Sequence, residues 1–280
     1  MPLRVLVAGN ATLDRYGDAW LPGGSVLYAG RAWRALGARV RVLTSAGGDL
    51  PPGALDGLDV SVVPAAATTR FTNEHRPDGT RTQRVDARAG SLSPAALPAG
   101  WDDCDVLHLA PVLGELDLDA WTRAVPARFV GLGVQGWVRD VAPDGRVLQP
   151  PWYPDPALLR ARVHAACLGE DDLHGQDALL ELLASAVPVV ALTLGERGCD
   201  VLSAGTTAHV GVYPTRAVDP VGAGDVFSAA FFFALARGEA PHAAARLGAA
   251  AASVVIEARA GEALYRVGEA FARSARVPGP

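Results

Sequence analysis

Apolar residues cluster in short runs, and the first of these predict a βαβ unit. An apolar run at residues 5–8 ends at Gly9, and residues 25–36 have helical spacing. Gly37 follows the helical segment, as is typical of a helix C-terminus, and residues 40–44 form a second apolar run. We therefore expect a strand, a helix and a second strand in this order.

The same alternation returns later, with apolar runs at residues 106–109, 129–133 and 187–194 separated by segments of helical spacing. Strands that are apolar throughout and separated by helices are typical of a parallel sheet with both faces covered. The pattern predicts an α/β fold with a doubly wound, mostly parallel sheet.

A different pattern occupies residues 68–74 and 80–86, where polar and apolar residues alternate on either side of Pro77-Asp78-Gly79. Alternation around such a turn predicts a β-hairpin. We interpret the region of about residues 68–88 as a small β flap. An ordinary edge hairpin without a role in a site is an equally good interpretation of these residues.

The last third of the chain predicts another antiparallel pair and two helices. Residues 199–203 and 207–212 form the pair, joined at Ala204-Gly205. A glycine-rich turn at 219–225 follows. Residues 226–237 are apolar on nearly every side, as in a helix buried in the core. An alanine-rich helix is expected at 241–257.

Length and charge favour one domain that acts on a small molecule. The 280 residues suffice for one large α/β core, so we expect a single domain over residues 1–280. The formal net charge is −5 and the charges are mixed, so the basic surface that nucleic acid requires is missing. No apolar run approaches the length of a membrane span.

The chain contains no lysine, which excludes Schiff-base chemistry and a phosphate-binding lysine of the Walker type. Cys104, Cys167 and Cys199 are scattered and odd in number, which favours reduced, buried thiols over a disulfide framework or a zinc site. The sequence begins with an apolar strand and no basic leader, so we expect a cytoplasmic protein.

The turn at residues 219–225 carries the clearest chemistry. Gly222, Ala223 and Gly224 directly precede a helix, so their amides and the helix dipole can stabilise an anion such as a transferring phosphoryl group. Asp225 follows at once, where a carboxylate can take a proton from an attacking hydroxyl. A capping role would also explain Asp225, but it would not explain the two glycines or Asp219.

This segment resembles the second motif of the ribokinase-like (PfkB) carbohydrate kinase family, Asp-Thr-x-Gly-Ala-Gly-Asp with a following Phe. Pro220 replaces the threonine, whereas the other motif positions match, including Phe227. The resemblance covers nearly the whole chain and implies a kinase that transfers phosphate from ATP, with Mg²⁺, to a polyol hydroxyl. It also implies that Asp225 is the base and that the flap is a lid over the substrate, through which two copies could form a homodimer.

The resemblance assigns further residues to the site. For the acceptor it implies Asn10, Asp14, Gly23, Gly24, Tyr28, Gln135 and Arg139. For the nucleotide it implies Thr193, Gly195, Gly198, Asp219, Gly222 and Gly224. Asn73, Glu74 and Arg84 of the flap are candidates to face the substrate. Without the resemblance, a turn or capping role is the better explanation of Asp14, and a plain turn is the competing explanation of the glycines at 195 and 198.

Three positions depart from the family pattern. Tyr28 stands where asparagine is frequent, and only Arg139 is retained from an Asp-x-Asn-x-Arg pattern that begins at Gln135. Gly169 and Asp172 replace the Asn-x-x-Glu element that organises magnesium, so Asp172 is the metal ligand that the resemblance implies. Glu170 and Asp171 are substitutes, or the three acids form a solvated helix start. The pattern is most similar to the inositol-kinase-like branch.

The acceptor is therefore expected to be a sugar, a cyclitol such as myo-inositol, or a nucleoside. One alternative is a non-catalytic nucleotide or sugar sensor on the same fold, suggested by the changes at 28 and 169–172. A dinucleotide-dependent oxidoreductase is a second alternative, but residues 9–14 lack the spaced glycines that such a cofactor needs.

Overall fold

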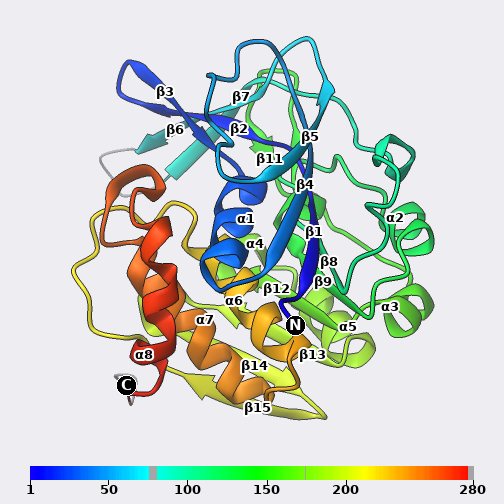
Figure 1. The fold of residues 1–280 in the computed structure, drawn as a ribbon, viewed down its shortest axis with the longest axis vertical. Helices are drawn as coiled ribbons and strands as arrows, with labels where there is room; N and C mark the ends of the chain where they lie inside the picture. Colours follow the sequence, from blue (N-terminus) through cyan, green and yellow to red (C-terminus); the bar gives the residue numbers. More distant parts are fainter. Residues whose placement is uncertain (76–80, 174, 277–280) are drawn as a thin grey trace.

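The computed structural model describes residues 1–75, 81–173 and 175–276. The predicted turn Pro77-Asp78-Gly79 lies outside the described residues. A nine-stranded sheet runs through the middle of the molecule (Figure 1). Its strands are β1 (Arg4–Ala8), β4 (Arg39–Ala46), β5 (Asp59–Pro64), β8 (Val106–Leu109), β9 (Phe129–Gly133), β12 (Ala165–Gly169), β13 (Val189–Thr193), β14 (Cys199–Ser203) and β15 (Thr206–Val210).

The strand order is β15-β14-β13-β12-β9-β8-β1-β4-β5, and only the pairs β13–β14 and β14–β15 are antiparallel. The predicted α/β fold with a doubly wound, mostly parallel sheet is confirmed. From β1 the chain first adds β4 and β5 on one side and then β8, β9, β12 and β13 on the other. The strand order thus reverses beside β1, and ligands bind at the carboxyl ends of strands at such a reversal.

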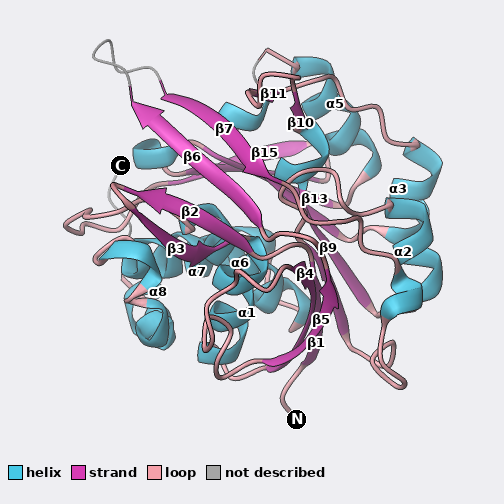
Figure 2. Ribbon diagram, turned by 90° about the horizontal axis from the view of Figure 1, so that it is seen from above, coloured by secondary structure: helices cyan, strands magenta, loops and turns pink. Residues whose placement is uncertain are grey.

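Helices cover both faces of the sheet, as Figure 2 shows from above. One layer contains α1 (Ser25–Ala35), α6 (Ala223–Ala236), α7 (Pro241–Val255) and α8 (Ala270–Ser274). The other contains α2 (Leu118–Ala124), α3 (Pro156–Arg162) and α5 (Asp177–Ala186). In β1, Val5 and Val7 pack in the first layer's core, whereas Leu6 and Ala8 pack in the second. Side chains of a strand alternate between its faces, so this strand must be apolar throughout.

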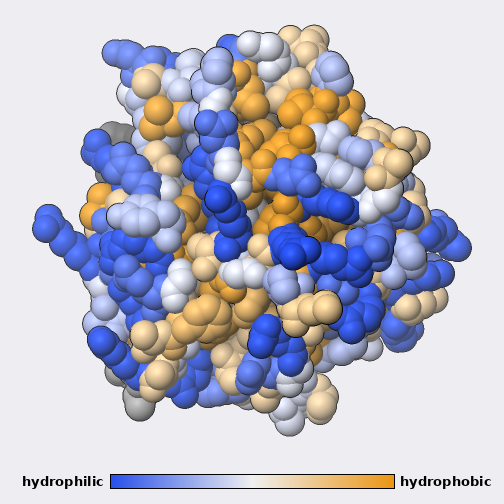
Figure 3. Space-filling view, in the orientation of Figure 1, coloured by the Kyte–Doolittle hydropathy of each residue, from blue (hydrophilic) through white to orange (hydrophobic). Residues whose placement is uncertain are grey.

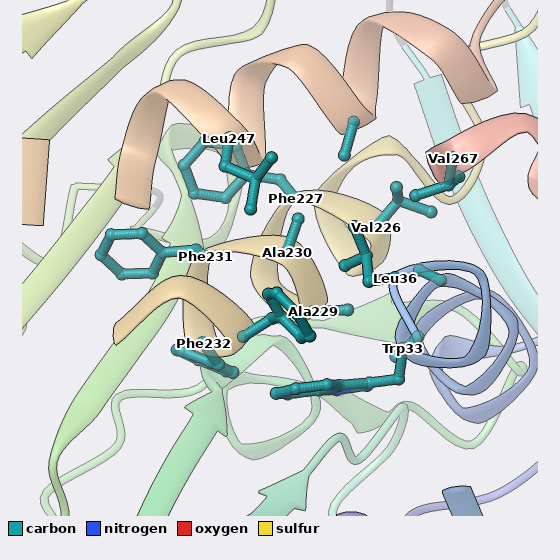
Figure 4. Close-up of a cluster of buried hydrophobic side chains, with 14 of the residues drawn as sticks. Trp33, Leu36, Val226, Phe227, Ala229, Ala230, Phe231, Phe232, Leu247 and Val267 are labelled. Carbon is teal, nitrogen blue, oxygen red and sulfur yellow. The ribbon is translucent and has the colours of Figure 1, made fainter. Parts of the chain in front are cut away.

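Helix α6 is the centre of the first layer. Figure 4 shows Phe227, Phe231 and Phe232 of this helix packed among Leu247 of α7 and Trp33 of α1. The prediction of a buried helix is confirmed, but its predicted start at residue 226 is wrong. The helix begins at Ala223 because Gly222 takes a left-handed conformation and serves as the N-cap.

A second, four-stranded sheet has the order β3-β2-β6-β7. Its strands are β2 (Thr12–Tyr16), β3 (Ala19–Gly23), β6 (Thr69–His75) and β7 (Arg81–Ala87). The predicted hairpin is confirmed as β6 and β7, but β2 and β3 double the size of the sheet. The sequence analysis missed them because each is only five residues long and Pro22 interrupts the apolar pattern.

Short elements complete the described structure: β10 (Asp140–Val141), β11 (Val147–Leu148) and α4 (Glu170–Leu173). All three cysteines are buried and free, as predicted. On the face seen in Figure 3, hydrophobic residues gather in the upper centre and hydrophilic ones occupy most of the rim. Within the described ranges, we find no helix that has both the length and the apolar character of a membrane span.

Candidate active site

The glycine turn is held in shape from both sides. The Asp219 carboxylate accepts a hydrogen bond from the Val221 amide at 3.0 Å, and the Ala223 amide donates to the Pro220 carbonyl at 3.1 Å. Gly222 has a φ of 79°, and a Cβ on it would lie 2.1 Å from the ring of Tyr28. Both its backbone conformation and its surroundings therefore require glycine.

We expected the amides of Gly222, Ala223 and Gly224 to bind an anion, and in the structure one of the three has an acceptor within the turn. The Ala223 amide is used by Pro220 to close the turn. Amides in the first turn of a helix have no acceptor within the helix, so those of Gly224 and Asp225 take its place beside Gly222. A Cβ on Gly224 would meet nothing within 4 Å, so this glycine faces open space.

Asp225 lies in the first turn of α6 and is half-buried. Desolvation of its enclosed carboxylate raises its pKa from 3.8 to about 6, and the negative charge of Asp172 acts in the same direction. A hydrogen bond from the Ser25 hydroxyl and the positive charge of Arg139 oppose this rise. The pKa of Asp225 thus lies near the value that suits a general base at neutral pH.

The Ser25 hydrogen bond brings two helix N-termini together. Ser25 is the first residue of α1 and is buried, and Gly24 before it has a φ of 92°. The positive ends of the dipoles of α1 and α6 therefore point into the same space. An anionic group at this point is stabilised by both helices.

Arg139 and Asp172 form the second charged group of the site. The distance from Arg139 Nη2 to Asp172 Oδ1 is 3.8 Å, and their side chains are only 15% and 9% exposed. The other Asp172 oxygen accepts a hydrogen bond from the Gly169 amide at 2.9 Å. The ends of β9 and β12 thus bring an arginine and two carboxylates, those of Asp172 and Asp225, into one electrostatic unit.

Asp14 lies on β2, next to the double glycine before α1. A Cβ on Gly23 would lie 2.0 Å from Asp14 Oδ2, so glycine is needed where the two strands meet. The Thr12 hydroxyl is 3.3 Å from Asp14 Oδ1. The small sheet thus places a partly exposed carboxylate beside the N-terminus of α1.

Tyr28 packs beneath the glycine turn. Its side chain is 2% exposed, and its ring contacts Gly222 on one side and the segment at Gly261 on the other. Desolvation raises its pKa well above the usual value, and the negative charges around it act in the same direction. The carboxylates among these charges are those of Asp14, Asp219 and Asp225. Tyr28 therefore joins the predicted acceptor side to the catalytic turn.

Asp219 connects the small sheet to the turn. Its Oδ2 atom accepts hydrogen bonds from the Tyr16 hydroxyl at 2.9 Å and from the Ala260 amide at 3.0 Å. Together with the Val221 bond, these contacts give both carboxylate oxygens protein partners. In this arrangement Asp219 shapes the site, although it was predicted to contact the nucleotide.

Several other predicted residues have contacts that give them a structural role. Asn10 is 2% exposed, donates to the Gly90 carbonyl and accepts from the Ser45 amide, so it joins the end of β4 to two loops. A Cβ on Gly198 would lie 2.2 Å from the Val210 carbonyl oxygen, so close strand packing explains this glycine. Gly195 is in a left-handed turn with open space around it.

Thr193 and Gln135 flank the site without such clear roles. The Thr193 hydroxyl, at the end of β13, donates to the Leu168 carbonyl at 3.4 Å. Gln135 is half-buried in the single 3₁₀ turn Val134–Val138 that leads to Arg139. Both residues are at carboxyl ends of sheet strands, on the same edge as Arg139 and Asp172.

The residues present do not fit a protein-built magnesium site. In the described part of the chain no group of three or more His, Cys, Asp or Glu side chains comes together as a metal site. Asp172 already has Arg139 and the Gly169 amide as partners, and Glu170 forms an ion pair with Arg197. The predicted ligand Asp172 is thus a single carboxylate paired with an arginine, and Mg²⁺ in a kinase site is typically held by one or two carboxylates together with phosphate oxygens and water.

Sequence reasoning missed Ser25 and Tyr16. Serine at the start of a helix is a frequent residue, so Ser25 had a local signal that was not used. Tyr16 had none, because its partner Asp219 lies 203 residues further along the chain.

Comparisons with known proteins agree with this fold. Residues 162–264 match the family model for pfkB family carbohydrate kinases. A search of curated protein sequences returned no match. Among solved structures, a pyrophosphate-dependent kinase in the ribokinase family, complexed with a pyrophosphate analog and myo-inositol, matches with a TM-score of 0.79. The identity is 18%, over 95% of this chain and 99% of that chain.

Two ribokinases are also similar. That of Thermotoga maritima matches with a TM-score of 0.70 and 18% identity, over 96% of this chain and 99% of the other. That of Arabidopsis thaliana, complexed with ribose and ATP, matches with a TM-score of 0.66 and 18% identity, over 96% of this chain and 99% of the other. The resemblance to the ribokinase-like (PfkB) carbohydrate kinases is confirmed, by sequence over residues 162–264 and by fold over nearly the whole chain.

Proposed function

We propose that the chain is a phosphotransferase that moves a phosphoryl group to a hydroxyl of a small polyol: a sugar, a cyclitol such as myo-inositol, or a nucleoside. The observation that carries this proposal is Asp225. Its carboxylate has a pKa of about 6 and lies where the N-termini of α1 and α6 meet. A base beside an anion-binding turn is what hydroxyl attack on a phosphoryl group requires.

In this mechanism Asp14 accepts hydrogen bonds from the acceptor's hydroxyls and holds one of them toward Asp225. The hydroxyl oxygen attacks the terminal phosphorus of the donor, and its proton passes to the Asp225 carboxylate. The bond from that phosphorus to the bridging oxygen breaks, and the bond electrons leave with the departing phosphate group. The base is then protonated and loses its proton to solvent after product release.

The developing charge on the phosphoryl oxygens is stabilised by two helix N-termini and by an arginine. The amides of Gly222, Gly224 and Asp225 supply hydrogen bonds, and Arg139 supplies a fixed positive charge. Arg139 is the natural candidate because its side chain is held beside Asp172 and acts electrostatically on Asp225. No lysine is available for this task.

The phosphoryl donor that we propose is ATP, as the resemblance implies, with inorganic pyrophosphate as the second candidate. One observation favours pyrophosphate. The features that anion binding explains, which are the glycine turn and the two helix N-termini, are all close to Asp225. Gly195 and Gly198 have turn and packing explanations instead. One similar structure is also of a pyrophosphate-dependent kinase.

The test is a matrix of donors and acceptors. ATP and pyrophosphate are each offered with myo-inositol, ribose, fructose, adenosine, cytidine and pseudouridine, and phosphorylated product is measured by mass spectrometry. We expect one donor and one acceptor class to give product that depends on Asp225. Tight binding of a polyol or nucleotide without product in any combination would favour the alternative of a non-catalytic sensor.

Cytoplasmic location and homodimer formation through the small sheet are further proposals that rest on the resemblance. For the homodimer, sedimentation of the full chain compared with a Trp20→Asp variant is informative, because Trp20 is partly exposed on β3, at the edge of this sheet. A dimeric wild type with a monomeric variant is expected. A monomeric wild type would contradict the proposal.

A further inference from the structure

His108 is a buried titratable residue to which the proposed mechanism gives no role. It lies within β8, is 0% exposed, and burial lowers its pKa to about 3. The imidazole is therefore neutral at any working pH. A neutral imidazole has one nitrogen that donates and one that accepts, so its two neighbours determine which is which.

The neighbours of His108 determine which ring nitrogen carries the proton. Trp33 Nε1 lies 3.0 Å from His108 Nδ1, and an indole N–H can only donate. The Nδ1 atom must then accept, so the proton is on Nε2. Nε2 is 3.5 Å from the Ser228 hydroxyl oxygen, which leaves the serine's own proton to be donated elsewhere.

The serine proton goes to the catalytic turn. Ser228 Oγ donates to the backbone carbonyl of Asp225 at 2.8 Å. The chain of hydrogen bonds thus runs in one direction, from Trp33 in α1 through His108 in the sheet to Ser228 and Asp225 in α6. It ends on the residue whose side chain is the proposed base.

The surroundings leave this chain little freedom to move. The ring of Phe232 packs edge-on against His108, with ring centroids 4.9 Å apart. Gly131 of β9 allows the close approach, because a Cβ there would lie 2.5 Å from the Phe232 ring. In Figure 4 Trp33 and Phe232 lie on the same side of α6, together with Ala229.

Helices α1 and α6 are therefore connected at two levels. At their N-termini the Ser25 hydroxyl bonds to the Asp225 side chain. About two turns further along α1, Trp33 reaches α6 through His108. These polar contacts add to the direct packing of the two helices, in which the ring centroids of Trp33 and Phe233 lie 5.9 Å apart.

We propose that His108 and Ser228 are positioning residues for Asp225, because the chain from Trp33 holds the Asp225 backbone so that its carboxylate meets Ser25 and the acceptor hydroxyl. This inference rests on the proposed function of Asp225 as a base. A displacement of about 1 Å at a reacting group can lower turnover by up to about a hundredfold, so such positioning has a measurable effect.

A helical serine that bonds to its own preceding turn is common, and the chain offers a matched control for that simpler role. Ser253 in α7 is buried, like Ser228, and its hydroxyl donates to the Ala250 carbonyl at 2.7 Å. Its hydroxyl also accepts a hydrogen bond from Arg273 of α8 at 2.9 Å. Ser228→Ala and Ser253→Ala therefore remove the same local bond in two places.

The first experiment needs no variant. Nitrogen-15 NMR of the imidazole in the wild-type protein reports which nitrogen of His108 carries the proton. We expect Nε2–H, without titration between pH 5 and 9. A proton on Nδ1 would overturn the proposal, because the hydrogen-bond direction would then be wrong.

The second experiment compares the two serine variants. With the acceptor and donor that the matrix identifies, Ser228→Ala is expected to lower kcat about tenfold while KM stays within about twofold. Ser253→Ala is expected to keep kcat per folded molecule. Equal kcat values in the two variants would overturn the proposal.

Failure of the proposed function can be separated from failure of this inference. Carbon-13 NMR follows the titration of the Asp225 carboxyl group without turnover. Misalignment with Ser25 is expected to raise the Asp225 pKa by about half a unit in Ser228→Ala, but not in Ser253→Ala. If the wild type phosphorylates no acceptor, the proposed function fails and this titration decides the inference: a shift supports it, and no shift overturns it.

Discussion

Replacing Asp225 by asparagine is expected to lower turnover and to raise the stability of the fold. Both effects follow from the desolvated carboxylate. Asparagine has the same shape and can still accept the hydrogen bond of Ser25, but it cannot take a proton from a hydroxyl. Loss of a general base lowers turnover by about 10²–10⁴-fold. We therefore expect kcat of Asp225→Asn to fall by this factor, with donor binding largely retained.

The same substitution is expected to stabilise the fold near neutral pH. The folded-state pKa of Asp225 is about 6 against an ordinary value of 3.8, so the ionised carboxylate disfavours folding. A difference of about 2 pKa units corresponds to about 3 kcal/mol, which is an upper limit because the residue is only half-buried. Asparagine removes this penalty, as often happens when a strained active-site residue is replaced.

The stability difference between wild type and Asp225→Asn depends on pH. Below pH 3.8 the carboxyl group is protonated in both states, so wild type and Asp225→Asn should have equal stability. Between this pH and about 6 the unfolded state loses its proton first, so the wild type loses stability relative to the variant as pH rises. Above about pH 6 the difference stays constant.

The assay is chemical denaturation at several pH values together with steady-state kinetics. Asp177→Asn is the control, because Asp177 is an exposed carboxylate in the first turn of α5. It should change neither kcat nor the pH dependence. Near-normal turnover of Asp225→Asn would refute the base role, and equal stability of wild type and variant at pH 8 would refute the desolvation argument.

Three further predictions concern the glycine turn, the buried Glu115 and the pH dependence of turnover. Gly222→Ala should destabilise the fold by about 3 kcal/mol or more in urea denaturation, because the new Cβ meets Tyr28 in a left-handed backbone conformation, whereas Gly224→Ala should change stability by less than about 1 kcal/mol. Glu115→Ala should cost about 3 kcal/mol or more by the same measurement, since this 3%-exposed carboxylate accepts hydrogen bonds from three backbone amides; an effect below about 1 kcal/mol would contradict this account. The kcat/KM of the wild type should rise with pH through about 6, because Asp225 must be ionised to act as base, and a flat profile from pH 5 to 8 would contradict this.

The main sheet and the buried helix could be predicted because their residues are apolar over several positions in a row. Strands β8 and β9 and helix α6 are of this kind. Strand β12 was not predicted, since Ala165 and Ala166 are weak strand formers and their burial depends on neighbouring strands. Short strands such as β2 are stabilised by pairing with partners that the local sequence does not specify.

For the site, local chemistry was predictable and long-range contacts were not. The motif around Asp225 predicts the turn and its glycines from a few adjacent residues, and it is the source of the proposal that Asp225 is the base. The hydrogen bonds from Ser25 to Asp225 and from Tyr16 to Asp219 join residues about 200 positions apart, and no local pattern encodes them. The use of the Ala223 amide within the turn likewise depends on the backbone path at Pro220.

The central claim is direct transfer of phosphate to an acceptor hydroxyl with Asp225 as base. The most direct measurement is phosphorus-31 NMR of wild type and Asp225→Asn side by side, with each donor and the acceptor panel. The account predicts a new phosphomonoester signal that grows with wild type and is at least about 100-fold slower with the variant. Donor hydrolysis to inorganic phosphate alone, or phosphomonoester formed at equal rates by both proteins, would contradict it.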